Sequence, residues 1–162
     1  MNTSDITRIV RKIQTSKLTL AFAESATAGM LASEIVKAKG TGTTFLGSIV
    51  TYNESVKQTL LGVKKKTLEL YTAESQQVTN EMVMGLHKLL KADICIAVTG
   101  LAETGASETE NKPVGTVFFS IFYKERIEEY REVFDDTPEN VRKKATEFIF
   151  TRMEEIYDRH FK

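Results

Sequence analysis

The sequence predicts an α/β fold in which a mainly parallel sheet is covered by helices on both faces. Segments with strand-like and helix-like patterns alternate over most of the 162 residues, and this alternation is typical of parallel sheets layered between helices. The apolar run at 94–98 is near-continuous, as expected for a central strand buried on both faces. We therefore expect a single α/β domain over residues 1–162.

The first half of the chain supplies helices and two strands. A helix follows Ser4, a residue type that favours helix N-termini, and a strand is expected over 18–23. A helix over roughly 28–38, a loop at 40–44, a strand over 45–52 and a short helix around 54–61 come next. The apolar face of the first helix has the i, i+3, i+4, i+7 spacing: Ile6, Ile9, Val10 and Ile13. Lys64, Lys65 and Lys66 are most simply a solvated turn.

The second half adds a long helix over 75–91 and the strand at 94–98. The polar segment 100–113 has no helix-like or strand-like spacing of apolar residues, so it is expected to be a loop. Two β-rich segments, 114–123 and 127–134, predict a hairpin around Lys124-Glu125, which adds an antiparallel member to the sheet. A last helix begins at Thr137-Pro138, because proline favours the first helical position. Its apolar face is Val141, Ala145, Phe148, Ile149 and Ile156.

Composition excludes several classes of protein. Lys plus Arg number 22 and Asp plus Glu number 22, so the chain lacks the basic excess of a nucleic-acid-binding domain. No apolar run is long enough to span a bilayer, and no basic-then-apolar leader opens the sequence. We expect a cytoplasmic protein with neither nucleic acid nor membrane as partner. The single cysteine, Cys95, lies in an apolar run, which favours a buried structural thiol.

The most informative segment is 24–29, where an apolar strand stops at small and polar residues. Ser25 is expected at a strand-to-helix turn, near the positive end of the following helix. Proteins place nucleophiles and bind anions at such positions, because unpaired N–H groups point outward there. The alternative interpretation is that Ser25 or Thr27 only caps the helix.

Three polar segments are expected at the carboxyl ends of neighbouring strands: 24–29, 52–57 and 99–113. The ligand crevice of such sheets lies at this edge, which favours the functional interpretation of Ser25. No histidine has a second ligand residue at metal-binding spacing, so His87 and His160 predict neither a metal site nor a Ser-His-Asp triad.

Lys57 is therefore the best candidate for the base that would accept a proton from Ser25. A lysine desolvated in a crevice loses part of its preference for the charged form. Tyr52 could relay a proton or orient the substrate, and the backbone N–H groups of Thr99 and Gly100 could meet an oxyanion or a phosphate. The alternatives are a solvated helix lysine at position 57 and an ordinary strand end at Gly100.

Together these segments resemble the C-terminal domain family of the competence/damage-inducible protein CinA. The resemblance runs in family order over nearly the whole chain. It rests on Ala23-Glu24-Ser25-x-Thr27-x-Gly29, Phe45 to Asn53 with Lys57, Leu61-Gly62-Val63, Ala92-Asp93-Ile94, Ala97 to Ala102, Lys112 to Val117, and Val141-Arg142.

The resemblance implies a three-layer α/β/α fold with a mostly parallel mixed sheet of about five strands. Stand-alone family members include nicotinamide mononucleotide deamidases, which hydrolyse the substrate carboxamide to nicotinic acid mononucleotide and ammonia in pyridine nucleotide recycling. The resemblance also implies a small-molecule substrate, no metal or cofactor, and a homo-oligomer. The implied catalytic residues are Ser25, Lys57 and Tyr52, and the implied substrate-binding residues are Glu24, Thr27, Gly29, Thr99, Gly100, Lys112 and Arg142.

This chain departs from the family pattern around the site. Ala26 and Ala28 stand where members commonly have cysteine and glycine, Thr72 replaces a glycine, and Glu103 falls in a loop that members fill with small residues. At Thr137 the chain lacks an arginine. Lost glycines, a lost arginine and gained acids leave a second hypothesis open: a degenerate, non-catalytic domain that binds a small molecule or a partner.

Overall fold

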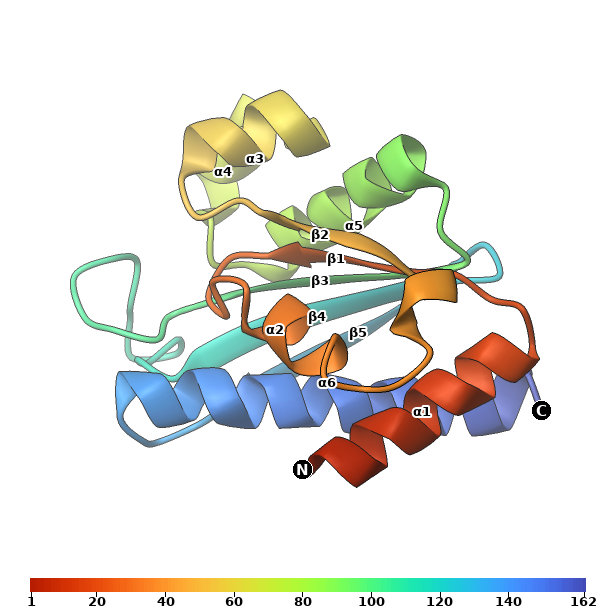
Figure 1. Ribbon diagram of the computed structural model, residues 1–162. Coiled ribbons are helices and arrows are strands. Elements are labelled where there is room, and N and C mark those ends of the chain that lie inside the picture. The colour runs from red at the N-terminus through yellow and green to blue at the C-terminus, as the bar shows by residue number, and fades with distance from the viewer.

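A five-stranded mixed sheet forms the centre of the computed structural model, which describes residues 1–162 (Figure 1). The strand order is β2-β1-β3-β4-β5. β1 pairs in parallel with β2 and β3, whereas β4 is antiparallel to both β3 and β5. The strands are β1 (Leu20–Glu24), β2 (Phe45–Val50), β3 (Ile94–Gly100), β4 (Thr116–Tyr123) and β5 (Arg126–Val133).

Helices cover both faces of the sheet, so the predicted three-layer α/β/α architecture is confirmed (Figure 1). One face carries α1 (Thr3–Thr15), α2 (Met30–Ile35) and α6 (Pro138–His160). The other carries α5 (Gln76–Leu90), on which α3 (Glu54–Leu61) and α4 (Lys65–Tyr71) pack. No helix is both long and apolar enough to cross a membrane.

Alternation along β1 divides the core between the two layers. Leu20 and Phe22 join the cluster formed with α1, α2 and α6, whereas Ala21 and Ala23 join the cluster formed with α5. Small residues on the second side let α5 lie close to the sheet. Cys95 belongs to that cluster and is fully buried. Burial raises the pKa of its thiol to about 12, which suits the predicted structural role.

Two sequence predictions in the first half are wrong. Asn2, not Ser4, caps α1: its side chain accepts from the backbone N–H of Asp5 in a capping box. The lysine-rich segment is not a solvated turn, because α4 begins at Lys65 and buries Leu68. One buried leucine over so short a helix leaves too little periodicity to be recognised in the sequence.

Other boundaries differ for reasons of backbone geometry. The helix expected from residue 28 begins only at Met30, because Ala28 and Gly29 have positive φ angles of 50° and 94°. The predicted hairpin is confirmed. Its turn residues Lys124 and Glu125 have φ angles of 45° and 58°, as a tight two-residue turn between twisted strands requires.

The last helix begins where the sequence predicts. The hydroxyl of Thr137 accepts from the backbone N–H of Asn140, and Pro138 occupies the first turn. α6 runs along one face of the sheet, and its N-terminal end lies near the edge at which β1 and β3 end (Figure 1). Arg142, in this part of α6, reaches the turn after β1.

Candidate active site

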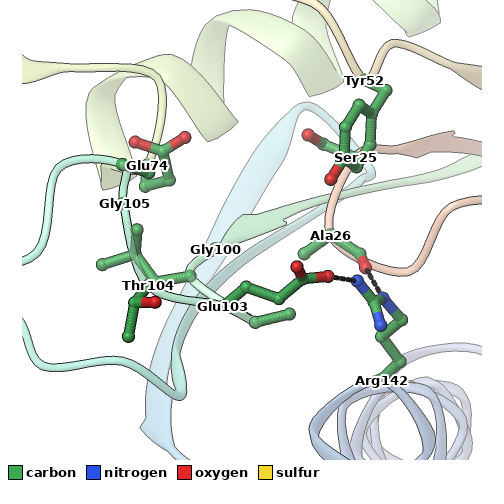
Figure 2. Close-up of a pocket in the computed structure, with 12 residues that line it drawn as sticks. Ser25, Ala26, Tyr52, Glu74, Gly100, Glu103, Thr104, Gly105 and Arg142 are labelled. Atoms are coloured by element: carbon green, nitrogen blue, oxygen red, sulfur yellow. Dashed lines mark hydrogen bonds and ion pairs between the residues drawn. The ribbon is translucent and has the colours of Figure 1, made fainter. Parts of the chain in front are cut away.

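A pocket of about 280 Å³ opens at the carboxyl edge of the sheet (Figure 2). It gathers the end of β1, the end of β2 and the loop after β3, as the sequence predicts for the polar segments. The segment before α5 and the first turns of α6 complete it. Its lining residues are Ser25, Ala26, Tyr52, Glu74, Gly100 to Ala106, and Arg142.

Ser25 and Lys57 form the central contact of the site. Ser25 follows β1 directly, and its backbone N–H donates to the carbonyl of Val98, which fixes the start of the turn to the sheet. The Lys57 ammonium donates to the Ser25 hydroxyl oxygen at 2.9 Å and to the carbonyl of Thr51 at 2.6 Å. Lys57 is only 1% exposed, so it is not a solvated helix lysine.

The short helix α3 places the lysine in this position. Asn53 caps α3 by accepting from the backbone N–H of Ser55, and Lys57 lies one turn further on. Desolvation lowers the pKa of Lys57 below the ordinary 10.5, although the charges of Glu74 and Glu54 oppose this change. A buried lysine with a lowered pKa is a more available base near neutral pH.

Neither Ser25 nor Thr27 caps the following helix. The N-cap residue of α2 is Gly29, with no side-chain cap bond. The Thr27 hydroxyl donates to Glu24 instead. The capping interpretation of the serine is therefore excluded, and the Ser25 hydroxyl makes its hydrogen bond with Lys57.

The buried carboxylate of Glu24 stabilises the turn that carries Ser25. Glu24 is fully buried, and its carboxylate accepts five hydrogen bonds of 2.8–3.0 Å. The donors are the hydroxyls of Thr27 and Ser48 and the backbone N–H groups of Gly29, Leu31 and Ala32. Glu24, Thr27 and Gly29 do not line the pocket, so the structure places them around the Ser25 turn rather than on the pocket surface.

This network changes which groups are available to an oxyanion. The sequence predicts unpaired, anion-binding N–H groups at the start of the helix after Ser25, but Gly29, Leu31 and Ala32 donate theirs to Glu24. The N–H of Ala26, directly after the serine, has no acceptor in the protein. Among the N–H groups that follow Ser25 in this turn, the N–H of Ala26 is therefore available to an anion in the pocket, whereas those of Gly29, Leu31 and Ala32 are not.

Gly100 lines the pocket at the end of β3. A Cβ at this position would lie 2.6 Å from the Thr116 carbonyl oxygen, so only glycine fits between the two strands. The N–H of Leu101 donates to Thr116 in the direction of β4. Because successive residues of a strand direct their N–H groups to opposite sides, the N–H of Gly100 points toward the side of β1 and Ser25.

Thr99 and Lys112 do not reach the pocket in this structure. The Thr99 hydroxyl donates to the carbonyl of Ala73. The Lys112 ammonium donates to Thr72, Ser107 and the carbonyl of Glu74 at 2.7–3.0 Å. Thr99 thus fastens the end of β3, and Lys112 the loop after it, to the segment before α5.

Thr72 is held in a strained conformation by this cluster. Its φ of 65° and ψ of 165° lie in a region that is essentially restricted to glycine. Its hydroxyl contacts both Lys112 and Ser107. The missing glycine noted in the sequence is thus compensated by hydrogen bonds that glycine cannot make.

Arg142 and Glu103 form an ion pair at the pocket wall (Figure 2). One Arg142 nitrogen lies 2.6 Å from a Glu103 carboxylate oxygen, and Nε donates to the carbonyl of Ala26 at 3.1 Å. Arg142 therefore touches the turn that carries Ser25. Glu103 places its charge in the pocket, as the sequence indicated, and directs that charge onto Arg142.

Tyr52 lines the pocket beside Ser25 and is 66% exposed. Its phenol has no hydrogen-bond partner in the protein, whereas its carbonyl lies 3.5 Å from the Lys57 ammonium. Glu74 is a pocket residue that the sequence did not indicate. It precedes α5 and is remote in the chain from the other site segments, so no local pattern singles it out.

Comparisons with known proteins agree with this fold. The family model of the CinA C-terminal domain matches residues 2–157. A CinA-like protein of Petrotoga mobilis is 42% identical over 135 residues, which cover 83% of this chain and 33% of that protein. A CinA-like protein of Thermotoga neapolitana is 46% identical over 114 residues, covering 70% of this chain and 28% of the relative. The chain spans about a third of the length of these curated relatives.

Solved structures extend the agreement to three dimensions. A CinA superfamily protein of Klebsiella pneumoniae has a TM-score of 0.92 and 31% identity, covering 98% of this chain and 99% of that one. Another from Escherichia coli has a TM-score of 0.86 and 29% identity, covering 94% and 91%. The molecule is a three-layer α/β/α protein whose pocket is lined by Ser25, and the Ser25 hydroxyl accepts from the buried Lys57 behind it. The chain belongs to the CinA C-terminal domain family.

Proposed function

We propose that the chain is an amidohydrolase that hydrolyses the carboxamide of nicotinamide mononucleotide, with Ser25 as nucleophile and Lys57 as base. The single observation that carries this proposal is the 2.9 Å contact between the buried Lys57 ammonium and the Ser25 hydroxyl at the pocket wall. A serine hydroxyl is a weak nucleophile until an adjacent base accepts its proton. Lys57, with its lowered pKa, is the adjacent base.

The reaction proceeds in two stages in this scheme. Neutral Lys57 accepts the Ser25 proton as Oγ attacks the carboxamide carbon, and the oxyanion meets the free N–H of Ala26. Lys57 then returns the proton to the nitrogen, so the C–N bond breaks and ammonia leaves. Water attacks the resulting ester with Lys57 again as base, which releases the carboxylic acid and restores the serine.

Tyr52 and Arg142 are the side chains best placed to bind the rest of the substrate. Tyr52 presents an exposed aromatic ring beside Ser25, which suits stacking on a pyridine ring. Arg142 is the cation on the pocket lining, and a guanidinium is suited to a phosphate. Glu103 competes with that phosphate for Arg142.

Ammonia release tests the proposal. The purified protein is incubated with millimolar nicotinamide mononucleotide, and ammonia and the acid product are measured against Ser25→Ala. We expect wild-type turnover and none with Ser25→Ala. Equal ammonia release by the two proteins would contradict the proposal.

A second candidate function is supported by the Arg142–Glu103 ion pair, which weakens the capture of a phosphate. In this alternative the domain binds a small molecule or a partner without turnover. A melting temperature that rises with the nucleotide, with no ammonia released by the wild-type protein, would favour it.

A further inference from the structure

The pocket contains a second carboxylate that the hydrolytic scheme leaves without a role. Glu74 lines the pocket on the other side from Ser25 and Tyr52 (Figure 2). Its Oε2 accepts from the Ser107 hydroxyl at 2.5 Å, and its Oε1 has no donor in the protein. Glu74 forms no ion pair, unlike Glu103, the other carboxylate of the pocket.

The surrounding hydrogen bonds fix the position of this carboxylate. The Lys112 ammonium donates to the Ser107 hydroxyl oxygen at 2.7 Å, so the Ser107 proton is directed onto Glu74. Lys112 also donates to the backbone carbonyl of Glu74 at 3.0 Å. The side chain and the backbone of Glu74 are therefore held by the same cluster.

The positive groups near the pocket are already engaged. Arg142 is paired with Glu103. Lys57 has Ser25 and two carbonyl oxygens as acceptors, and Lys112 has two hydroxyls and one carbonyl. Burial lowers the pKa of both lysines, and the charge of Glu74 opposes this change in each without forming an ion pair with either. A ligand in the pocket thus meets in Glu74 a carboxylate with one oxygen that accepts no hydrogen bond from the protein and with no cation in direct contact.

We propose that Glu74 recognises a positive charge on the substrate, so that the pocket favours a carboxamide carried by a cationic ring over its neutral counterpart. An N-alkylated pyridinium carboxamide has this chemistry, with the charge on the ring that bears the reacting group. An opposite charge within a few ångströms in a partly desolvated site contributes substantially to binding. The inference rests on the proposed function insofar as it places the ring in the Ser25 pocket.

The test compares oxidised nicotinamide mononucleotide with its reduced form, whose ring is neutral. Both carry the same ribose and phosphate, so their affinities differ mainly through the ring charge. Binding is measured by calorimetry in the Ser25→Ala background, which prevents turnover. We expect the oxidised form to bind about tenfold more tightly, which corresponds to about 1.4 kcal/mol. Adding Glu74→Gln reduces this preference to about twofold or less.

Two further variants serve as controls in the same background. Glu110→Gln removes a charge from an exposed carboxylate outside the pocket and is expected to keep the preference. Ser107→Ala removes the donor to Glu74 but leaves its charge, so it keeps most of the preference. Melting temperatures confirm that each variant is folded.

The inference is overturned if the two forms bind equally, if neither binds, or if Glu74→Gln leaves the preference unchanged. These outcomes differ from failure of the proposed function. Ammonia release without a preference for the charged ring would overturn only the role of Glu74. A preference for the charged ring without ammonia release by the wild-type protein would overturn only the amidase.

Discussion

The Lys57 ammonium lies 2.9 Å from the Ser25 hydroxyl oxygen, although 32 residues separate the two in the chain. The contact forms because β1 and β2 are parallel neighbours whose carboxyl ends meet at one edge. The turn after β1 presents the serine, and α3 directs the lysine back toward it. The pair thus depends on the sheet rather than on a local motif.

The rate of hydrolysis should rise with pH. Lys57 accepts a proton only when neutral, so protonation below its pKa removes the base. Because burial lowers this pKa from 10.5, we expect the rising limb of kcat/KM to be centred below 10.5. Lys57→Met should remove that limb and reduce kcat by about 10²–10⁴-fold. A variant with near-wild-type turnover across neutral pH would eliminate Lys57 as the base.

The same burial makes stability depend on pH. The pKa of Lys57 is lower in the folded protein than in the unfolded chain, so between the two values the unfolded state binds more protons. The free energy of unfolding therefore rises with pH through this window. Urea titrations of wild type and Lys57→Met at several pH values measure this contribution, and parallel pH profiles of the two proteins would contradict it.

Glu24→Gln should destabilise the fold and disturb the Ser25 turn. The carboxylate accepts five hydrogen bonds while fully buried, and an amide nitrogen would face donors. We expect a loss of about 2–3 kcal/mol in the free energy of unfolding and a lower kcat. Glu34→Gln, which removes a more exposed carboxylate from α2, should cost about 0.5 kcal/mol or less. Equal losses in the two variants would show that the hydrogen bonds of Glu24 do not contribute more to stability than an exposed carboxylate does.

Ala28→Gly should stabilise the protein. Ala28 is exposed and has a φ of 50°, a conformation that a Cβ disfavours. We expect a gain of about 0.5–1 kcal/mol in chemical denaturation. Ala32→Gly, in the body of α2, should instead lose about 1 kcal/mol. A loss of stability in Ala28→Gly would mean that the backbone at residue 28 is not strained.

Glu103→Gln should improve the use of a phosphate-bearing substrate. The change releases the Arg142 guanidinium from its ion pair, which leaves it free for a phosphate. We expect the KM for nicotinamide mononucleotide to fall about fivefold, equivalent to about 1 kcal/mol. The KM for nicotinamide riboside, which lacks the phosphate, should stay nearly constant. If both values change equally, Arg142 does not contact the phosphate.

Most of the fold could be predicted because apolar periodicity is strong in the long elements. The buried run of β3, the stripe of α5 and the Thr137-Pro138 start of α6 all have clear patterns. α4 escaped prediction because its seven residues bury only Leu68. The late start of α2 depends on positive φ angles at Ala28 and Gly29, and alanine gives no sign of such a conformation.

The site residues that lie at strand ends could be predicted from the sequence. Those that reach the site only through packing between distant segments could not. Ser25, Tyr52 and Gly100 line the pocket because each lies at the carboxyl end of a strand. Lys112 also follows that edge in sequence, but three oxygen acceptors hold its ammonium away from the pocket. Glu74 reaches the pocket only through the packing of the segment before α5, a relationship between distant parts of the chain.

Detection of a covalent intermediate tests the central claim most directly. Wild-type protein mixed with nicotinamide mononucleotide is quenched in acid within one turnover, digested, and its peptides are weighed by mass spectrometry. The account predicts an acyl ester on Ser25 that is absent from Ser25→Ala. Ammonia release with no adduct on the Ser25 peptide, or with an adduct on another residue, would contradict it.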